Sequence, residues 1–475
     1  MPVSLRILVV EFIRMKKSFS ILFTLFTFIA CQKPEPCCPV DPPADPPQDS
    51  TQQWQQYGIP FGGVAQPEDA VLYEVNPLVF STSRNIQGIL PRLDSIKALG
   101  VNVVWLMPIY EMGVDRSVGS PYCISDYFKV NPEYGTIDDL RELVNSAHAK
   151  GMAVMLDWVA NHTSWDHSWM SDQSYYVVEN GSVIHPPGTN WEDVAELNYA
   201  NAEMRAEMIS AMKYWVLEAN IDGYRCDYAT GVPGWFWEEV IDSLRAIPGR
   251  ELLLFAESND LSLLNEGFDM AFSWNFYGAL LDAFNGGDAR NLRTTHLGEF
   301  STLASGKTMV RFVTNHDQHA WDDVPQDLLG GQNGAIAAFA AAAYMGGVPL
   351  IYNGQEKGLP YQLPFFIPTS VAINWSLNPA ITKRYEKIMQ VYAQEPALKR
   401  PELLDNYSTY SISAFTKASS SDTLLIAINT NGSAKSFTFP VEWQGKQLTD
   451  LITAQTAVSS TAISLNGFQY CVWKK

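Results

Sequence analysis

The sequence predicts an α/β protein whose main part is a (β/α)8 TIM barrel, followed by a small C-terminal antiparallel β-sandwich. Short apolar runs alternate with amphipathic, helix-like stretches over most of the chain. Eight of these runs have the near-continuous apolar character of parallel strands that are buried on both faces. From about residue 397, short alternating runs separated by Asn, Gly and Ser replace this rhythm, as is typical of an antiparallel sheet.

The eight strand candidates follow one another in regular order along the chain. They lie at residues 71–76, 101–108, 153–159, 221–227, 251–257, 268–273, 308–315 and 348–354. Helical periodicity separates most of them, as over 90–100 and 137–151, and both of these segments end in a glycine, a common helix stop. Eight strands favour a closed barrel over an open doubly wound sheet, and no G-x-G-x-x-G motif follows the first strand.

Two segments within the predicted barrel (67–396) depart from this alternation. Residues 158–200, after the third strand, carry many aromatic residues and little periodicity. They predict a long excursion on the face where the catalytic loops of a barrel lie. The stretch between the sixth and seventh strands is polar, and we assign no helix to it. The sandwich is predicted over 397–475.

The first residues have the pattern of an export signal. Two lysines precede an apolar stretch, residues 19–30, that leads into Cys31. The sequence FIAC resembles the lipobox of bacterial lipoproteins, which implies that residues 1–31 are a signal segment and that Cys31 is lipidated. An ordinary secretory signal or an uncleaved anchor remains the alternative. The proline-rich stretch 32–66 is then a tether, and we expect an exported protein held at a membrane by its lipid.

Composition narrows the possible partners. The formal net charge is −19, which argues against nucleic acid, because polyanion binding needs clustered Lys and Arg. With 47% hydrophobic and 17% charged residues, the chain can bury a large core.

Three carboxylates each follow a different apolar run: Asp227, Glu257 and Asp317. A lone Asp at a strand end usually caps a helix or forms a turn. Three in corresponding positions predict an acid/base site, because parallel barrel strands direct their carboxyl ends to one face. Arg225, two residues before Asp227, projects to the same side of its strand, and its fixed charge would keep Asp227 ionised.

Seven sequence blocks resemble the α-amylase family of retaining glycoside hydrolases (glycoside hydrolase family 13). The four short ones are DWVANH (157–162), GYRCD (223–227), AES (256–258) and FVTNHD (312–317). The other three begin at residues 71, 120 and 348. The resemblance implies a starch-type α-glucan or maltooligosaccharide substrate, hydrolysis of α-1,4-glucosidic bonds through a covalent glycosyl-enzyme intermediate, and no organic cofactor.

The resemblance also implies residue roles. Asp227 matches the nucleophile, Glu257 the general acid/base and Asp317 the third carboxylate, which favours the distorted sugar of the transition state. Glu257 must hold a proton at neutral pH, so we expect burial and neighbouring carboxylates to raise its pKa.

Three further residues match substrate contacts of the family. His162 and His316 match histidines that hydrogen-bond the sugar next to the cleaved bond, and Tyr122 matches the aromatic residue that stacks on it. Four tryptophans of the excursion are either core residues or sugar platforms: Trp158, Trp165, Trp169 and Trp191.

Calcium binding is left open. Asn161 matches a family ligand, but Glu196 stands in place of the family's calcium-binding Asp. The segment DYATG replaces the usual Lys-His with Thr230 and Gly231. Oxygen ligation of Ca²⁺ is chemically reasonable with these residues.

Two other functions fit the same residues. A transglycosylase or an isomerase would use the same intermediate with a sugar hydroxyl in place of water. A non-catalytic surface protein could bind glycans with a site that has lost its activity, although this chain retains all three carboxylates.

Overall fold

The computed structural model describes residues 54–418 and 423–475. The predicted signal segment, Cys31 and residues 32–53 of the predicted tether lie outside the described residues. No helix in the described part of the chain is both long and apolar enough to cross a membrane.

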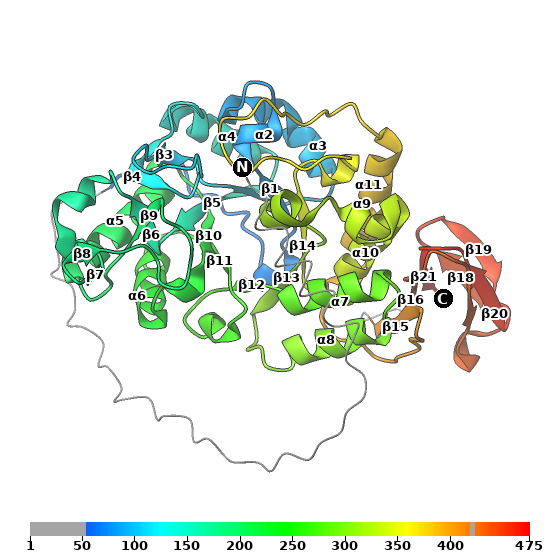
Figure 1. Cartoon of the computed structure of the whole chain (residues 1–475). Coiled ribbons are helices and arrows are strands. Elements are labelled where there is room, and N and C mark those ends of the chain that lie inside the picture. The colour runs from blue at the N-terminus through cyan, green and yellow to red at the C-terminus, as the bar shows by residue number, and fades with distance from the viewer. Residues whose placement is uncertain (1–53, 419–422) are drawn as a thin grey trace, which may run out of the picture. The chain divides into compact units, whose positions relative to one another are not determined.

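Eight parallel strands close into a barrel, which confirms the predicted fold class (Figure 1). Around the barrel they follow the order β1-β14-β13-β12-β11-β10-β5-β2. Their bounds are β1 (Leu72–Val75), β2 (Val103–Leu106), β5 (Ala153–Val159), β10 (Gly223–Asp227), β11 (Leu253–Ala256), β12 (Met270–Phe272), β13 (Thr308–Arg311) and β14 (Val348–Tyr352). Every residue of these strands is buried, because side chains fill the barrel on one face and helices cover the other.

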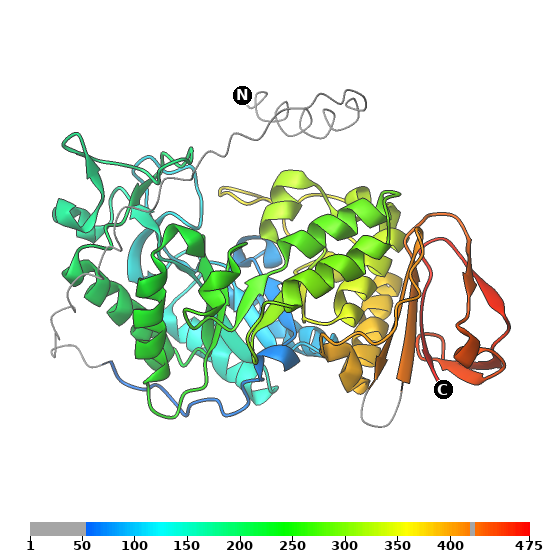
Figure 2. The ribbon, with the colours of Figure 1, turned by 90° about the horizontal axis from the view of Figure 1, so that it is seen from below.

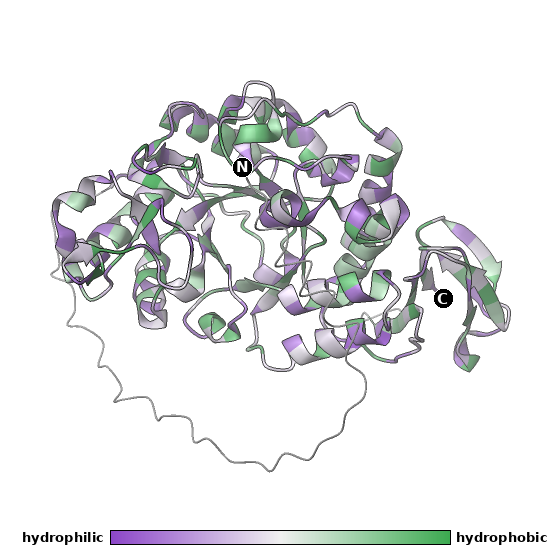
Figure 3. Ribbon diagram, viewed as in Figure 1, coloured by the Kyte–Doolittle hydropathy of each residue, from purple (hydrophilic) through white to green (hydrophobic). Residues whose placement is uncertain are grey.

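Helices surround the barrel (Figure 1). The longer ones are α3 (Leu93–Ala98), α4 (Ile137–Ala149), α5 (Ala202–Glu218), α6 (Gly234–Arg245), α7 (Trp274–Phe284), α8 (Arg290–Phe300), α10 (Gly331–Met345) and α11 (Pro379–Gln394). Figure 3 shows hydrophilic and hydrophobic residues alternating along the outer helices, as expected of helices that bury one face. Helix α4 begins with a capping box, in which Thr136 and Asp139 each bind the other's backbone N–H.

Helices α7 and α8 occupy the polar stretch to which the sequence analysis assigned no helix. Helix α8 escaped recognition because its buried face consists of Leu292, His296 and Glu299. These residues have helical spacing, but two of the three are polar. A hydrophobic period was therefore absent from the sequence.

Two excursions lie on the carboxyl side of the barrel, because they follow the C-terminal ends of β2 and β5. The first excursion contains one antiparallel pair of strands. The second, predicted as residues 158–200, contains two short antiparallel pairs. The strands are β3 (Tyr110–Met112) with β4 (Ile124–Val130), β6 (His162–Ser164) with β9 (Val194–Glu196), and β7 (Val178–Glu179) with β8 (Ser182–Val183).

Residues 54–66 lie against the barrel, although the tether was predicted to extend to residue 66. The indole N–H of Trp54 donates to the carbonyl of Ser210 (3.0 Å), and the backbone N–H of Tyr57 donates to that of Leu217 (2.8 Å). Both acceptors lie on α5. The predicted tether boundary is therefore placed too late.

The C-terminal domain is antiparallel, as predicted. Strands β15-β16-β21-β18-β19 form one sheet, and β17 pairs with β20. Their bounds are β15 (Ile412–Ala418), β16 (Thr423–Asn429), β17 (Lys435–Thr438), β18 (Gln447–Asp450), β19 (Gln455–Val458), β20 (Ala462–Leu465) and β21 (Tyr470–Lys474). Figure 2 shows β15 and β16 beside the barrel helices, where β16 contacts α10.

Candidate active site

The three predicted carboxylates come together at the carboxyl face of the barrel. Asp227 is the last residue of β10, Glu257 directly follows β11, and Asp317 lies in the loop after β13. Their side chains are 12%, 18% and 32% exposed, respectively, so all three remain open to a ligand and Asp317 is the most open. The strand ends alone account for this convergence.

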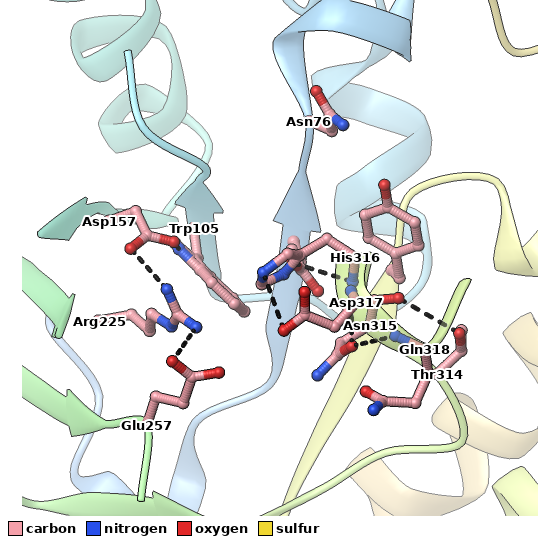
Figure 4. A network of polar contacts seen from close by, with 12 residues as sticks. Asn76, Trp105, Asp157, Arg225, Glu257, Thr314, Asn315, His316, Asp317 and Gln318 are labelled. Carbon is pink, nitrogen blue, oxygen red and sulfur yellow. Dashed lines mark hydrogen bonds and ion pairs between the residues drawn. The ribbon is translucent and has the colours of Figure 1, made fainter. Parts of the chain in front are cut away.

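Arg225 lies between three carboxylates of the site and contacts each of them. Its Nη1 donates to Asp227 Oδ1 (2.9 Å) and to Asp157 Oδ1 (2.7 Å), and its Nη2 lies 2.9 Å from Glu257 Oε2. Figure 4 shows the guanidinium between Asp157 and Glu257. Asp157 stands directly opposite Arg225 in the parallel register of β5 and β10. Because Arg225 is fully buried, its charge is available only to these carboxylates.

The pKa of Glu257 differs from the expectation. Burial would raise it, but the charge of Arg225 and the backbone N–H of Tyr228 (2.8 Å) lower it below its ordinary value. Burial raises the pKa of Asp227 well above its ordinary value, and the opposing effect of Arg225 is smaller. The predicted raised pKa of Glu257 is therefore wrong for the ligand-free site. At Asp227 the effect of burial exceeds that of the Arg225 charge, which was expected to keep the pKa of this carboxyl low.

A second polar chain runs through His316. Its Nδ1 lies 2.5 Å from Glu74 Oε1, and its Nε2 lies 3.0 Å from the hydroxyl of Tyr122 and 3.5 Å from Asp317 Oδ2. Burial opposes a charged ring, but the carboxylates of Asp317 and Glu74 outweigh it and raise the pKa of His316 to about 9. His316 is therefore an imidazolium at neutral pH, with both nitrogens donating.

Glu74→Gln is expected to shift the alkaline limb of the pH profile of kcat/KM to lower pH by about one unit, because an opposite charge in contact raises a histidine pKa by that order. Without the Glu74 charge, His316 loses its proton sooner as the pH rises. Steady-state kinetics across the pH range measure this shift.

Glu356→Gln is the matched control. Glu356 is also a buried carboxyl, but it accepts from the hydroxyl of Tyr73 (2.9 Å). Its replacement should change stability without moving the limb. An unmoved limb in Glu74→Gln would show that Glu74 does not govern the charge of His316.

The structure also brings Tyr122 and His162 to this face. The hydroxyl of Tyr122 donates to Asp157 Oδ2 (3.1 Å), which fixes the ring between Arg225 and His316. His162 is buried beside the backbone of Tyr122, and burial lowers its pKa to about 4, so this ring is neutral. A neutral imidazole can both donate and accept a hydrogen bond with a sugar hydroxyl.

The four tryptophans of the excursion differ in their surroundings. Trp158 is fully buried and packs on Tyr110 and Tyr127, so it is a core residue. Trp165 and Trp169 are partly buried against the same core. Trp191 is partly buried, with its ring 5.5 Å from that of His162, at the edge of the site.

Comparison with known proteins agrees with this geometry. A model described as "Alpha amylase, catalytic domain" matches residues 78–182. Alpha-amylase MalA of Haloarcula japonica is 29% identical over 312 residues, which cover 63% of this chain and 46% of that protein. Alpha-amylase 2 of Dictyoglomus thermophilum is 27% identical over 391 residues, 77% of this chain and 67% of that protein. The crystal structure of an α-amylase from Lactobacillus plantarum superposes with a TM-score of 0.78 at 27% identity, covering 86% of this chain and 99% of that one.

The family model, the curated relatives and the solved structure all place this chain with the α-amylase family of glycoside hydrolases. The chain spans about half the length of the Haloarcula relative. The resemblance seen in the seven sequence blocks is thereby confirmed at the level of the family and the fold.

The sequence analysis missed two carboxylates that contact the predicted site residues. Asp157 and Glu74 stand inside the apolar strand runs AVMLDWV and VLYEVN, and both are fully buried. An acidic residue within such a run was the available signal, because a buried carboxylate needs a partner. Their partners, Arg225 and His316, lie 68 and 242 residues away along the chain.

The calcium ligands expected from the family are only partly supplied. Asn161 Nδ2 donates to Glu196 Oε2 (3.0 Å), and the Asn161 side-chain oxygen lies 2.3 Å from where a Cβ on Gly231 would be. Burial raises the pKa of Glu196 to about 7. Among the described residues no group of three His, Cys, Asp or Glu side chains could hold a metal, and Ca²⁺ takes about six to eight oxygens. Asn161 and Glu196 by themselves supply too few oxygens for calcium, so calcium binding stays a prediction and no mechanistic step is routed through it.

Treatment with EDTA is accordingly expected to leave the midpoint of thermal unfolding unchanged. Asn161 and Glu196 satisfy each other through their hydrogen bond. Differential scanning calorimetry with EDTA and with added CaCl₂ measures the effect. A higher midpoint in CaCl₂ that is lost in Asn161→Ala would instead establish the site that the resemblance implied.

Proposed function

We propose that this chain is a retaining α-glycosidase that hydrolyses α-1,4-glucosidic bonds in starch-type glucans or maltooligosaccharides. The supporting observation is that Asp227 Oδ1 and Glu257 Oε2 each lie 2.9 Å from a terminal nitrogen of the Arg225 guanidinium. Retaining enzymes hold their two carboxyl groups about 5–5.5 Å apart, whereas inverting enzymes need about 6.5–9.5 Å to admit a water. Two carboxyl groups held by one guanidinium fit the shorter separation.

The residues then perform two displacements. A carboxylate oxygen of Asp227 attacks the anomeric carbon while Glu257 gives its proton to the departing glycosidic oxygen, so the C–O bond breaks and a glycosyl ester forms. Glu257 next takes a proton from water, whose oxygen attacks the same carbon and releases Asp227. Two inversions return the α configuration. Asp317 and His316 face the hydroxyls of the sugar that becomes attached.

The first step needs a proton on Glu257. In the ligand-free site the pKa of Asp227 is raised and that of Glu257 is lowered, so substrate binding has to favour transfer of a proton to Glu257. Both carboxyl groups lie 2.9 Å from terminal nitrogens of Arg225, so the path for this transfer is short. A glycosidic oxygen beside Glu257 accepts a hydrogen bond only from the protonated form, so substrate binding favours the transfer.

Product analysis tests the proposal. Maltoheptaose should be shortened, and proton NMR of the first products should show the α anomer before mutarotation. An initial β anomer would refute the retaining mechanism. Exclusive formation of longer oligosaccharides would assign the same residues to a transglycosylase, and a rearranged disaccharide to an isomerase. No reaction with any α-glucan would leave only glycan binding.

For localisation we propose export and a lipid anchor on Cys31, supported by the sequence of residues 1–31. A membrane association in cells that persists in Cys31→Ser would contradict it.

A further inference from the structure

Tyr228, the residue directly after Asp227, has a backbone conformation that tyrosine rarely adopts. Its φ of 40° and ψ of 48° lie in the left-handed region. Glycine and asparagine adopt this region more readily, because a larger side chain crowds the backbone there. Such a conformation persists only where the surrounding structure holds it, and these conformations are concentrated at functional sites. The position of Tyr228 beside the proposed nucleophile therefore calls for a functional explanation.

The left-handed turn directs two successive N–H groups toward Glu257. The backbone N–H of Tyr228 donates to Glu257 Oε2 (2.8 Å), and that of Ala229 donates to the backbone carbonyl of Glu257 (3.1 Å). In an extended strand successive N–H groups point to opposite sides, so they could not both reach one residue. The backbone N–H of Glu257 in turn donates to the carbonyl of Cys226 (2.9 Å). Glu257 is thus attached to residues 226–229 through both its main chain and its side chain.

Neighbouring residues hold the turn in this conformation. The backbone N–H of Gly231 donates to the carbonyl of Tyr228 (2.8 Å), and the indole N–H of Trp237 donates to that of Ala229 (2.9 Å). The ring of Tyr228 packs edge-on against Trp191, with the ring centroids 5.1 Å apart. The turn is therefore fixed by contacts within the chain, and it presents a preorganised donor to Glu257.

Two N–H donors meet the same oxygen of the Glu257 carboxyl group. Glu257 Oε2 accepts from the N–H of Tyr228 and lies 2.9 Å from Arg225 Nη2. In a carboxylic acid the hydroxyl oxygen carries the proton, and the carbonyl oxygen is the better acceptor. Donors at Oε2 therefore favour the form in which Oε1 carries the proton. Figure 4 shows this second oxygen turned away from Arg225.

We propose that Tyr228 is a positioning residue for the general acid. Its left-handed backbone holds Glu257 Oε2 and leaves Oε1 to give the proton to the departing glycosidic oxygen. This inference rests on the proposed function. The proton passes from Oε1 to that oxygen as the bond from the oxygen to the anomeric carbon breaks and the bond to Asp227 forms. Because the donor is a main-chain N–H, the role depends on the backbone conformation of residue 228 and not on the tyrosine ring.

Substitutions at residue 228 separate the backbone conformation from the ring. Glycine and asparagine tolerate the left-handed region, whereas β-branched valine does not. Tyr228→Val should lower kcat/KM for maltoheptaose about 100-fold, the order expected for a displaced general acid. Tyr228→Gly and Tyr228→Asn also lack the ring, but they should recover most of this loss. Phe468→Val is the matched control, because Phe468 is a left-handed aromatic residue (φ 56°) of the C-terminal domain, and it should leave kcat/KM unchanged.

α-Maltosyl fluoride distinguishes a displaced acid from a damaged site. Fluoride leaves without a proton, and kcat/KM covers only the steps up to the glycosyl ester, so Tyr228→Val should lower this kcat/KM by less than about tenfold. The ratio of the two kcat/KM values for one sample does not depend on the fraction of folded protein. An equal loss on both substrates, or the same loss in Tyr228→Gly as in Tyr228→Val, would overturn the positioning role. A failure of the unsubstituted chain to cleave either substrate would instead overturn the proposed function on which this inference rests.

Discussion

Replacing Asp227 by asparagine is expected to lower kcat by roughly 10⁵-fold, the order found when a catalytic nucleophile is removed. An amide oxygen is too weak a nucleophile to form the glycosyl ester. The fold should persist, because the Asn side-chain oxygen can still accept from Arg225 Nη1, which lies 2.9 Å from Asp227 Oδ1. Reducing-sugar release from maltoheptaose measures the loss, and circular dichroism checks the fold.

Asp94→Asn is the control for this prediction. Its side chain is 84% exposed on α3, where it pairs with Lys150. This change removes the same charge from the surface and should leave kcat unaltered. Loss of a nucleophile should leave far less than about a hundredth of the activity. If Asp227→Asn kept more than about a hundredth, Asp227 would not be the nucleophile.

The strands and the three carboxylates could be predicted from the sequence for one physical reason. Strands buried on both faces are continuously apolar, so each one ends visibly where the first polar residue stands. In a closed parallel barrel, those ends share one face. Asp227 and Glu257 were therefore recognisable from local sequence, although 30 residues separate them.

The proton affinities of the pair could not be predicted in the same way. The N–H that lowers the pKa of Glu257 belongs to Tyr228, whose backbone lies in the left-handed region (φ 40°). A tyrosine rarely adopts that conformation, and no local pattern signals it. The orientation of Arg225, which contacts three carboxylates, likewise depends on packing between strands. Glu74 was not recognised as a site residue for a similar reason, since its partner His316 is remote in sequence.

Arg225→Met is expected to lower the free energy of unfolding by about 3–5 kcal/mol at neutral pH, because it leaves buried carboxylates without their countercharge. Arg225 contacts Asp157, Asp227 and Glu257, and the first of these is fully buried. On the proposed mechanism, activity should be lost as well, since Asp227 and Glu257 would no longer be held on one planar donor.

The pH dependence of the loss of stability shows whether Arg225→Met acts by removing a charge or by removing packing contacts. Without Arg225, the folded-state pKa of each of the three carboxyl groups rises above its unfolded value of about 4. Asp157, whose pKa burial already raises to about 6 against the effect of Arg225, should rise further. A carboxyl with a raised folded pKa binds its proton more tightly when folded. Its contribution to the stability of the folded state is present at acid pH. That contribution is lost as the pH rises through the unfolded pKa toward the folded pKa.

The difference in unfolding midpoint between Arg225→Met and the unsubstituted protein should therefore be larger at pH 8 than at pH 5. Thermal unfolding at both pH values measures it. Arg225→Lys keeps one positive charge without the bridging geometry, so it should reduce this pH effect while activity stays low. An equal difference at both pH values would mean that Arg225 stabilises the barrel by packing alone. The pairing with three carboxylates predicts the opposite, because their repulsion grows as each loses its proton.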